Sequence, residues 1–322
     1  MNCLHVSILV ASTLVTPLAI AQTANYPNRP IRLIAASSAG GPVDVIARAL
    51  SVSLGEVLGQ QIVVDNRAGA AGLIGAEIVA KSAPDGYTLM FGFSGPLAIV
   101  PHLVKQVPYD TNKDFTPITL VASAPYVLLV HPSLPVKSVK DLIDLAKAQP
   151  GKLNFASGGT GVGIHMAGEL FNLAAGVKIT HVPYKGAGPG MTALLAGEVN
   201  MMFNGMSPAL PHVKSGRLRG LAVGGAKRST LLPDLPTIAE FGLQFNTHGW
   251  YGLLGPAGLP RAMVAKLRND TIRAMGNAET KERLAALAVE IIGSTPEEFA
   301  AMLKQEYAQW GKVVKAAGIK QQ

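Results

Sequence analysis

The chain is poor in cysteine and in charged side chains, and both shortages narrow the classes of protein to which it can belong. Its 322 residues include one cysteine, Cys3, so a disulfide framework and a zinc site built from several cysteines are excluded. Charged residues form only 15% of the chain, and the formal net charge of +8 is spread thinly. Because lysine and arginine do not cluster, the positive charge favours small anionic ligands over a nucleic-acid-binding face.

Long apolar runs are absent beyond the N-terminal segment. Residues 6–21 are uncharged and mostly apolar, and they end in Ala19-Ile20-Ala21, a small-x-small cleavage site. We therefore predict a signal peptide over residues 1–21, cleaved after Ala21, and an exported, periplasmic mature chain. A short membrane anchor is the alternative, because no lysine or arginine precedes the apolar run. The next most apolar stretch, residues 89–100, is broken by two glycines, a serine and a proline.

Motifs for nucleotide binding and for catalysis are missing or incomplete. No Walker sequence is present, and in Gly159-Thr160-Gly161-Val162-Gly163 the third glycine stands one position too early for a dinucleotide fingerprint. His165 and Glu169 are four residues apart, but no second histidine stands at ligand spacing, so we expect no metal and no cofactor. Gly92-Phe93-Ser94-Gly95-Pro96 differs from the serine-hydrolase elbow at its last position. A serine hydrolase that uses Ser94 is the enzymatic alternative, although we expect a binding protein and not an enzyme.

Short apolar runs alternate with helical patterns along the rest of the chain. The 48% of hydrophobic residues suffices for a core, and the length suggests roughly two domains. Such alternation predicts α/β layers with mostly parallel sheets, which bind ligands beyond the carboxyl ends of their strands. The expected strands cover residues 31–36, 62–64, 87–93, 126–130, 153–156, 179–182, 199–203 and 221–223, and helices cover 260–275, 280–288 and 296–317.

Two glycine-rich turns share one design. The strand 31–36 leads into Ser37-Ser38-Ala39-Gly40-Gly41 before Pro42 opens a helix, and the strand 153–156 leads into Ser157-Gly158-Gly159-Thr160-Gly161 before another. At such turns backbone N–H groups lack partners and the helix dipole is positive, while Asp44 can cap the first turn. If the two turns face one cleft, they can hold a carboxylate without arginine or lysine. Two helix ends with several hydrogen bonds would reach about −8 kcal/mol, or micromolar affinity.

A series of longer motifs runs through the whole mature chain. In order, these are Tyr26-Pro27-Asn28-Arg29-Pro30-Ile31-Arg32-Leu33, Val64-Asp65-Asn66-Arg67, Pro84-Asp85-Gly86-Tyr87-Thr88-Leu89, His181-Val182-Pro183-Tyr184-Lys185-Gly186, Leu232-Pro233-Asp234-Leu235-Pro236-Thr237 and Trp310-Gly311-Lys312-Val313-Val314-Lys315. With these motifs in this order, the chain resembles the Bug family of periplasmic solute receptors, the extracytoplasmic subunits of tripartite tricarboxylate transporters.

The resemblance implies two α/β lobes of the type II periplasmic-binding-protein fold, a Venus flytrap with a mixed, mostly parallel sheet in each lobe. We place lobe 1 at residues 22–122 plus 247–322 and lobe 2 at residues 123–246. The resemblance further implies that the lobes close over a small carboxylate, such as a di- or tricarboxylate, an amino acid or an aromatic acid. The receptor would deliver this ligand to a large and a small membrane subunit. We expect a monomer with no nucleic-acid partner.

The resemblance also maps the ligand site onto the two glycine-rich loops. The candidates in these loops are Ser37, Ser38, Ala39, Gly40 and Gly41, and Ser157, Gly158, Gly159, Thr160 and Gly161. We add Ser94, Asn204 and Tyr184, although Tyr184 lies equally well in the cleft or on the ordinary surface. Trp250 and Tyr251, near an inter-lobe strand, we expect in the core rather than as a platform for a ligand.

The first loop departs from the family pattern. Where the family often has a Pro-Phe-Pro-like stretch before its first glycine pair, this chain has Ala36-Ser37-Ser38-Ala39. The two hydroxyls either contact the ligand or cap the helix, so we do not transfer ligand specificity from the family. A ligand-sensing subunit of a membrane signalling protein is a further alternative, because it needs the same binding chemistry with a different partner.

Overall fold

The computed structural model describes residues 26–37, 39–40, 42–69, 72–184, 186–319 and 321. The predicted signal peptide and the candidates Ser38 and Gly41 lie outside the described residues. In chain order, the elements are β1 (Ile31–Ala35), α2 (Pro42–Leu58), β2 (Ile62–Asn66), α3 (Leu73–Ala80), β3 (Thr88–Gly92), η2 (Gly95–Ile99), η3 (Val100–His102), β4 (Phe115–Val130), α4 (Val139–Ala148), β5 (Asn154–Ser157), α5 (Gly163–Ala175), β6 (Thr180–Pro183), α6 (Ala187–Leu195), β7 (Met201–Gly205), α7 (Met206–Lys214), β8 (Arg219–Val223), η4 (Ile238–Phe241), β9 (His248–Pro256), α8 (Arg261–Gly276), α9 (Ala278–Ala286), β10 (Glu290–Ile291) and α10 (Pro296–Ala316).

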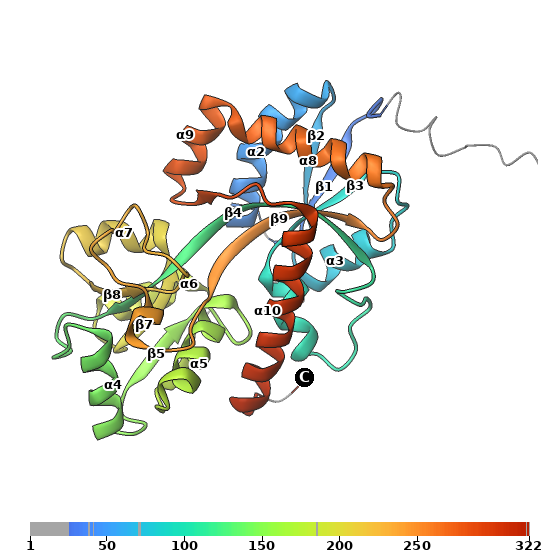
Figure 1. Cartoon of the computed structure of the whole chain (residues 1–322). Helices are drawn as coiled ribbons and strands as arrows, with labels where there is room; N and C mark the ends of the chain where they lie inside the picture. The colour runs from blue at the N-terminus through green and yellow to red at the C-terminus, as the bar shows by residue number, and fades with distance from the viewer. Residues whose placement is uncertain are drawn as a thin grey trace, which may run out of the picture.

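The strands form a mixed sheet whose two ends repeat one connectivity (Figure 1). Across the sheet the order is β2-β1-β3-β9-β4-β7-β5-β6, so that β1 lies between β2 and β3, and β5 between β6 and β7. Both groups are parallel. We call the group β1–β3 with its helices the first half and the group β5–β7 with its helices the second half. The predicted α/β class with a mixed sheet is confirmed, and in the described residues the parallel pairing of named strands is confined to these two groups.

Two long antiparallel strands, β4 and β9, join the halves (Figure 1). β4 pairs with β9 as far as Pro125, and from Tyr126 onward it pairs with β7 and β8. The chain returns between the halves beside the same point. There the Gly224 N–H donates to the Tyr126 carbonyl at 2.8 Å, and the Thr247 N–H donates to the Gly224 carbonyl at 2.9 Å. Pro125 and Tyr126 therefore mark the crossing from one half to the other.

The parallel strands of the first half are covered on both faces, which is why their sequences are continuously apolar. Along β1, Leu33 and Ala35 belong to a core cluster with residues of α2, α8 and α9, whereas Ile34 belongs to a cluster with residues of α3 and α10. Successive side chains of a strand point to opposite faces, so each face needs its own apolar set. Because both faces of β1 are buried, the position and direction of the loop that follows β1 are fixed.

The C-terminal helix α10 packs against both halves (Figure 1). It begins at a capping box, in which the Glu298 N–H donates to Thr295 Oγ1 at 3.1 Å and the Thr295 N–H donates to the Glu298 carboxylate at 2.8 Å. Phe299 and Leu303 pack in the core of the first half, whereas Trp310 packs in the core of the second half. One helix thus links the two cores. No helix in the described ranges, α10 included, is both long and apolar enough to cross a membrane.

Candidate functional site

A cleft with two adjoining cavities lies between the halves. The larger cavity, of about 710 Å³, has walls from both halves that include Val45, Gly158 and Met206. The smaller cavity has a volume of about 400 Å³ and includes Phe93 and Trp250 in its walls. The residues that line both cavities are Pro42, Tyr126, Val162, Gly163, Gly249 and Tyr251. Because these shared residues come from both halves and from the joining strands β4 and β9, the two cavities form one cleft.

Helices from both halves begin at this cleft. Pro42 and Gly163, the first residues of α2 and α5, line both cavities, and the first residues of α6 and α7 line the larger one. Gly72 before α3 and Gly95 at the start of η2 line the smaller one. Helix starts present N–H groups without helical partners and the positive end of the dipole. None of the described residues in the two walls carries a formal charge, so a ligand meets no charged side chain of these walls.

In the first loop, Asp44 accepts a hydrogen bond from the backbone N–H of Gly40. This N–H donates to Asp44 Oδ2 at 2.8 Å, and Arg48 Nε donates to Asp44 Oδ1 at 2.8 Å. Burial by itself raises the pKa of Asp44, but the hydrogen bonds from Gly40, Asn66 and Arg48 outweigh it and hold the pKa below its usual value. Asp44 is therefore an ionised cap, as predicted, and a carboxylate stands at the start of α2.

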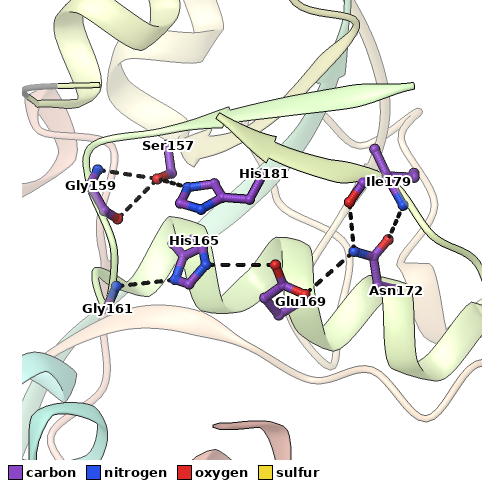
Figure 2. Close-up of polar contacts among 8 residues, drawn as sticks. All are labelled: Ser157, Gly159, Gly161, His165, Glu169, Asn172, Ile179 and His181. Carbon is purple, nitrogen blue, oxygen red and sulfur yellow. Dashed lines mark hydrogen bonds and ion pairs between the residues drawn. The ribbon is translucent and has the colours of Figure 1, made fainter. Parts of the chain in front are cut away.

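In the second loop, Ser157 and His165 accept hydrogen bonds from the N–H groups of two glycines (Figure 2). The Gly159 N–H donates to Ser157 Oγ at 3.1 Å, and the Gly161 N–H donates to His165 Nδ1 at 3.1 Å. The expectation that the glycine N–H groups of both loops lack partners is thus wrong for Gly40, Gly159 and Gly161. Helix geometry leaves the N–H groups of the first helical turns as the donors for a ligand.

Two histidines, His165 and His181, contact the second loop (Figure 2). The rings of His165 and His181 have centroids 3.9 Å apart, and His181 Nε2 lies 2.6 Å from Ser157 Oγ. Burial lowers the pKa of His181 to about 4, together with the repulsion that His165 exerts when it is protonated and against an opposing effect of Glu169. Because His165 accepts at Nδ1, its proton is on Nε2, which faces Glu169 Oε1 at 3.6 Å. No group of three or more histidine, cysteine, aspartate or glutamate residues in the described part of the chain is placed to hold a metal ion.

The structure separates the predicted site residues by position. Those that line the smaller cavity are Ser37, Ser94 and Gly161, and those that line the larger are Gly40, Gly158 and Asn204. Five predicted site residues line neither cavity. Ser157, Gly159 and Tyr184 lie in or beside the second glycine-rich loop, and Ala39 and Thr160 are exposed. Ser157 is fully buried, and its carbonyl accepts the Tyr184 N–H at 3.0 Å. These two residues therefore belong to the support of the loop rather than to the wall of the cleft.

Sequence reasoning missed the aromatic walls of the cleft. Tyr126 stands within the apolar run of β4, which predicts only a buried strand. Tyr251 lines both cavities, and Trp250 is in the core, packed on Phe299, but also lines the smaller cavity. A side chain at Gly163 would overlap the Tyr126 hydroxyl, so glycine at the start of α5 allows that hydroxyl to lie close to the helix end. No local motif marks these tyrosines, because the crossing of β4 and β9 between the halves is what brings them to the cleft.

Ser94 is held by a carboxylate from α10. Its Oγ donates to Glu306 Oε1 at 2.9 Å, and Trp250 Nε1 donates to Glu306 Oε2. Burial raises the pKa of Glu306 to about 7, against hydrogen bonds from Trp250 and Ser94 that lower it. A hydrolase elbow holds its serine in a strained turn, whereas Ser94 has an ordinary helical backbone with φ −54° and ψ −39°. The serine-hydrolase alternative is therefore not supported.

The chain matches known solute receptors along most of its length. The family model described as the tripartite tricarboxylate transporter family receptor matches residues 46–319. Among curated proteins, the chain is 38% identical over 297 residues to protein BugT of Bordetella pertussis, a match that covers 92% of this chain and 91% of that protein. The resemblance to the Bug family is thereby confirmed.

Two similar solved structures were determined with carboxylates. An R. palustris protein solved with adipate is 37% identical, with a TM-score of 0.78 and coverage of 92% of this chain and 100% of that one. MatC from Rhodopseudomonas palustris, solved with bound malate, is 31% identical, with a TM-score of 0.75 and coverage of 90% and 100%. By these matches, the chain belongs to the family of tripartite tricarboxylate transporter receptors, which are solute-binding proteins and not enzymes.

Proposed function

We propose that this chain is an exported receptor that captures a small carboxylate between its two halves and delivers it to a membrane transporter. The observation that carries the proposal is the meeting of helix starts from both halves at one cleft whose described walls hold no charged side chain. A helix start stabilises an anion by about 0.3–1 kcal/mol when exposed and by up to about 2 kcal/mol when partly buried. Several such ends with a few hydrogen bonds account for roughly micromolar affinity without arginine. The adipate and malate of the two relatives support a carboxylate as the ligand.

The halves would act as lobes that close on the ligand. Our lobe limits remain residues 22–122 plus 247–322 and residues 123–246. The change of partner of β4 at Pro125 and the start of β9 at His248 support them. The end of α10 is an exception, because Trp310 packs with the second half although it follows the second crossing in sequence.

Export and partnership complete the proposal. Residues 1–21 would direct the chain to the periplasm, where the mature receptor would act as a monomer with a large and a small membrane subunit. A ligand-sensing receptor would use the same cleft. Affinity purification from native membranes separates the two roles, because transport requires the two transporter subunits to copurify with the liganded receptor, whereas recovery of a membrane signalling protein in their place would favour sensing.

Thermal unfolding of the mature chain tests the binding function. The panel consists of mono-, di- and tricarboxylates, amino acids and aromatic acids, each paired with the amide that replaces all of its carboxylates. A ligand that binds only the folded state at about one hundred times its Kd adds about 2.7 kcal/mol of stability, so at least one acid should raise Tm by several degrees. The paired amide should not, because it lacks the charge that the helix starts stabilise. No shift with any acid, or equal shifts with the amides, would contradict the proposal.

A further inference from the structure

At Ser94, the smaller cavity has a hydrogen-bond polarity opposite to that of the helix starts that also line it. Ser94 lines this cavity and is 6% exposed, and it donates its hydroxyl proton to Glu306 Oε1 at 2.9 Å. A serine hydroxyl has one proton and two acceptor lone pairs. While Glu306 is ionised, the Ser94 proton is committed to it, and Ser94 presents only lone pairs to the cavity. A polar ligand group beside Ser94 must therefore donate a hydrogen bond to it, which a carboxylate is unable to do.

Glu306 places a carboxylate directly behind this serine. Both of its oxygens are bonded to neutral donors, Oε1 to the Ser94 hydroxyl and Oε2 to Trp250 Nε1. No lysine, arginine or histidine is among the groups that act on the Glu306 carboxyl within the described ranges. The negative charge of the ionised side chain is therefore not compensated by the protein. An anionic group at Ser94 is repelled, and a cationic group is attracted.

Aromatic side chains form much of the remaining wall. Those that line the smaller cavity are Phe93, Tyr126, Trp250 and Tyr251. The faces of aromatic rings carry negative electrostatic potential and attract ammonium groups, most strongly where water is excluded. The aromatic rings, the Ser94 lone pairs and the Glu306 carboxylate all favour a positively charged group that donates hydrogen bonds.

We propose that Glu306, acting through Ser94, is a specificity-determining residue that makes the smaller cavity a subsite for an ammonium group. The ligand class is then a carboxylate that also carries an ammonium group, with its two charges divided between the helix starts and the smaller cavity. This inference rests on the proposed function, because it assumes that the cleft binds a carboxylate.

The acidity of Glu306 adds a pH signature. Burial raises the pKa of this carboxyl to about 7, and a bound ammonium group favours its ionised form. Affinity for an ammonium-bearing ligand should thus rise as pH increases through about 7 and level off above it. Burial raises the pKa of Tyr126, and the charge of Glu306 raises it as well, so Tyr126 stays neutral in this pH range. The other titratable groups on elements packed against α10 are His102 in η3, His248 and Tyr251 on β9, and His165 and Glu169 on α5.

Calorimetric titration with matched ligands tests the inference. One set consists of hexanoate, 6-hydroxyhexanoate, adipate and 6-aminohexanoate, a second set consists of the corresponding four-carbon acids, and a third set consists of propionate, lactate and alanine. Within a set only one substituent changes, at the far end of the chain in the first two sets and on the carbon next to the carboxylate in the third. In each set that binds, the ammonium member should bind roughly tenfold more tightly than the others, which corresponds to about 1.4 kcal/mol.

Two variants and one control separate specificity from folding. Glu306→Gln keeps the shape but removes the charge. Its amide oxygen must face Trp250 Nε1, which can only donate, so its NH2 group donates to Ser94 Oγ and frees the serine proton. The variant should therefore reduce the preference for the ammonium member and abolish its pH dependence. Ser94→Ala removes the contact while leaving Glu306 in place, and it should reduce the same preference. Glu297→Gln, at an exposed position on α10, should leave the preference as it is in the wild type.

The outcomes are distinct. Either of two results overturns the inference while the proposed function stands. One is a preference for the diacid. The other is a preference for the ammonium member that is the same in Glu306→Gln, Ser94→Ala and Glu297→Gln. If neither these sets nor the wider carboxylate panel gives any binding at millimolar concentration, the proposed function fails and the inference fails with it.

Discussion

The two glycine-rich loops solve one structural problem with different chemistry. In each loop a glycine N–H is bonded by the side chain four residues later, Gly40 by Asp44 and Gly161 by His165. Both side chains cap the start of a helix that begins at the cleft. In the first half the cap is an ionised carboxylate with Arg48 as its partner, and in the second half it is the unprotonated nitrogen of an imidazole.

This difference predicts unequal roles for the two halves. A carboxylate at a helix start stabilises the helix by offsetting its positive end, but it also opposes an anionic ligand at the same place. A neutral acceptor satisfies the glycine N–H and leaves the dipole uncompensated. The second half, where α5, α6 and α7 all begin at the cleft, should therefore contribute more of the affinity for an anion.

Removal of His165 should have the largest effect. His165→Ala leaves the Gly161 N–H without an acceptor in a loop that is partly enclosed, at a cost of about 1–3 kcal/mol. We expect carboxylate affinity to fall by roughly ten- to a hundredfold, as measured by calorimetry. His165→Asn restores an acceptor at the position of Nδ1 and should recover most of the loss. Wild-type affinity in His165→Ala would show that this cap does not shape the site.

Strain in the two loops should have the next largest effect. Gly40 and Gly159 have φ angles of +77° and +128°, which side-chain-bearing residues rarely adopt, yet an added Cβ at either position meets no heavy atom closer than 3.7 Å. Gly40→Val and Gly159→Val should therefore shift the loops while the fold stays intact, with about tenfold weaker binding from about 1–3 kcal/mol of strain. Circular dichroism checks the fold. Equal wild-type affinity in both variants would remove these loops from the site.

Acid should loosen the second loop before the first. The pKa of His181 is lowered to about 4, so its stabilising effect is complete above the unfolded value of about 6.5 and is lost as pH falls toward 4. The lowered pKa of Asp44 works at a lower pH, because its effect is lost only below the ordinary carboxyl range. Hydrogen exchange at about pH 5 should show earlier opening at residues 157–161, worth on the order of 1 kcal/mol. His181→Gln should abolish this step, and simultaneous opening of both loops would refute the ordering.

Neutralisation of the acidic cap should have the smallest effect. Asp44→Asn keeps an acceptor for the Gly40 N–H but removes a negative charge from the start of α2. We expect carboxylate affinity to rise two- to fivefold, from about 0.3–1 kcal/mol, while the free energy of unfolding falls. Glu56→Gln, at an exposed position near the other end of α2, is the matched control and should change neither quantity. Weaker carboxylate binding in Asp44→Asn would mean that this carboxylate helps to form the site.

Local signals in the sequence predicted the elements that deliver the loops. The strands expected at residues 31–36 and 153–156 are β1 and β5 within one residue, because short apolar runs that end in glycine-rich turns are strong local signals. The cap by Asp44 was also predictable, since it depends on spacing alone. His165 stands at the same spacing from Gly161, and this repeated spacing is a signal that sequence reasoning overlooked.

The long strands could not be predicted in the same way. β4 covers Phe115–Val130, whereas only residues 126–130 were expected, because Pro117 and Pro125 argue against a strand. The structure accommodates them with a shift of register after Pro117 and with a change of partner strand after Pro125. Tyr126 and Tyr251 reach the cleft only through this long-range pairing, so no local pattern identifies them.

A structure of the mature protein with the carboxylate that gives the largest thermal shift would test the central claim most directly. The account predicts that carboxylate oxygens lie within about 3 Å of backbone N–H groups in the first turns of α2 and α5, with Tyr126 and Tyr251 against the ligand. A carboxylate bound outside this cleft, or held by one half alone, would contradict the account.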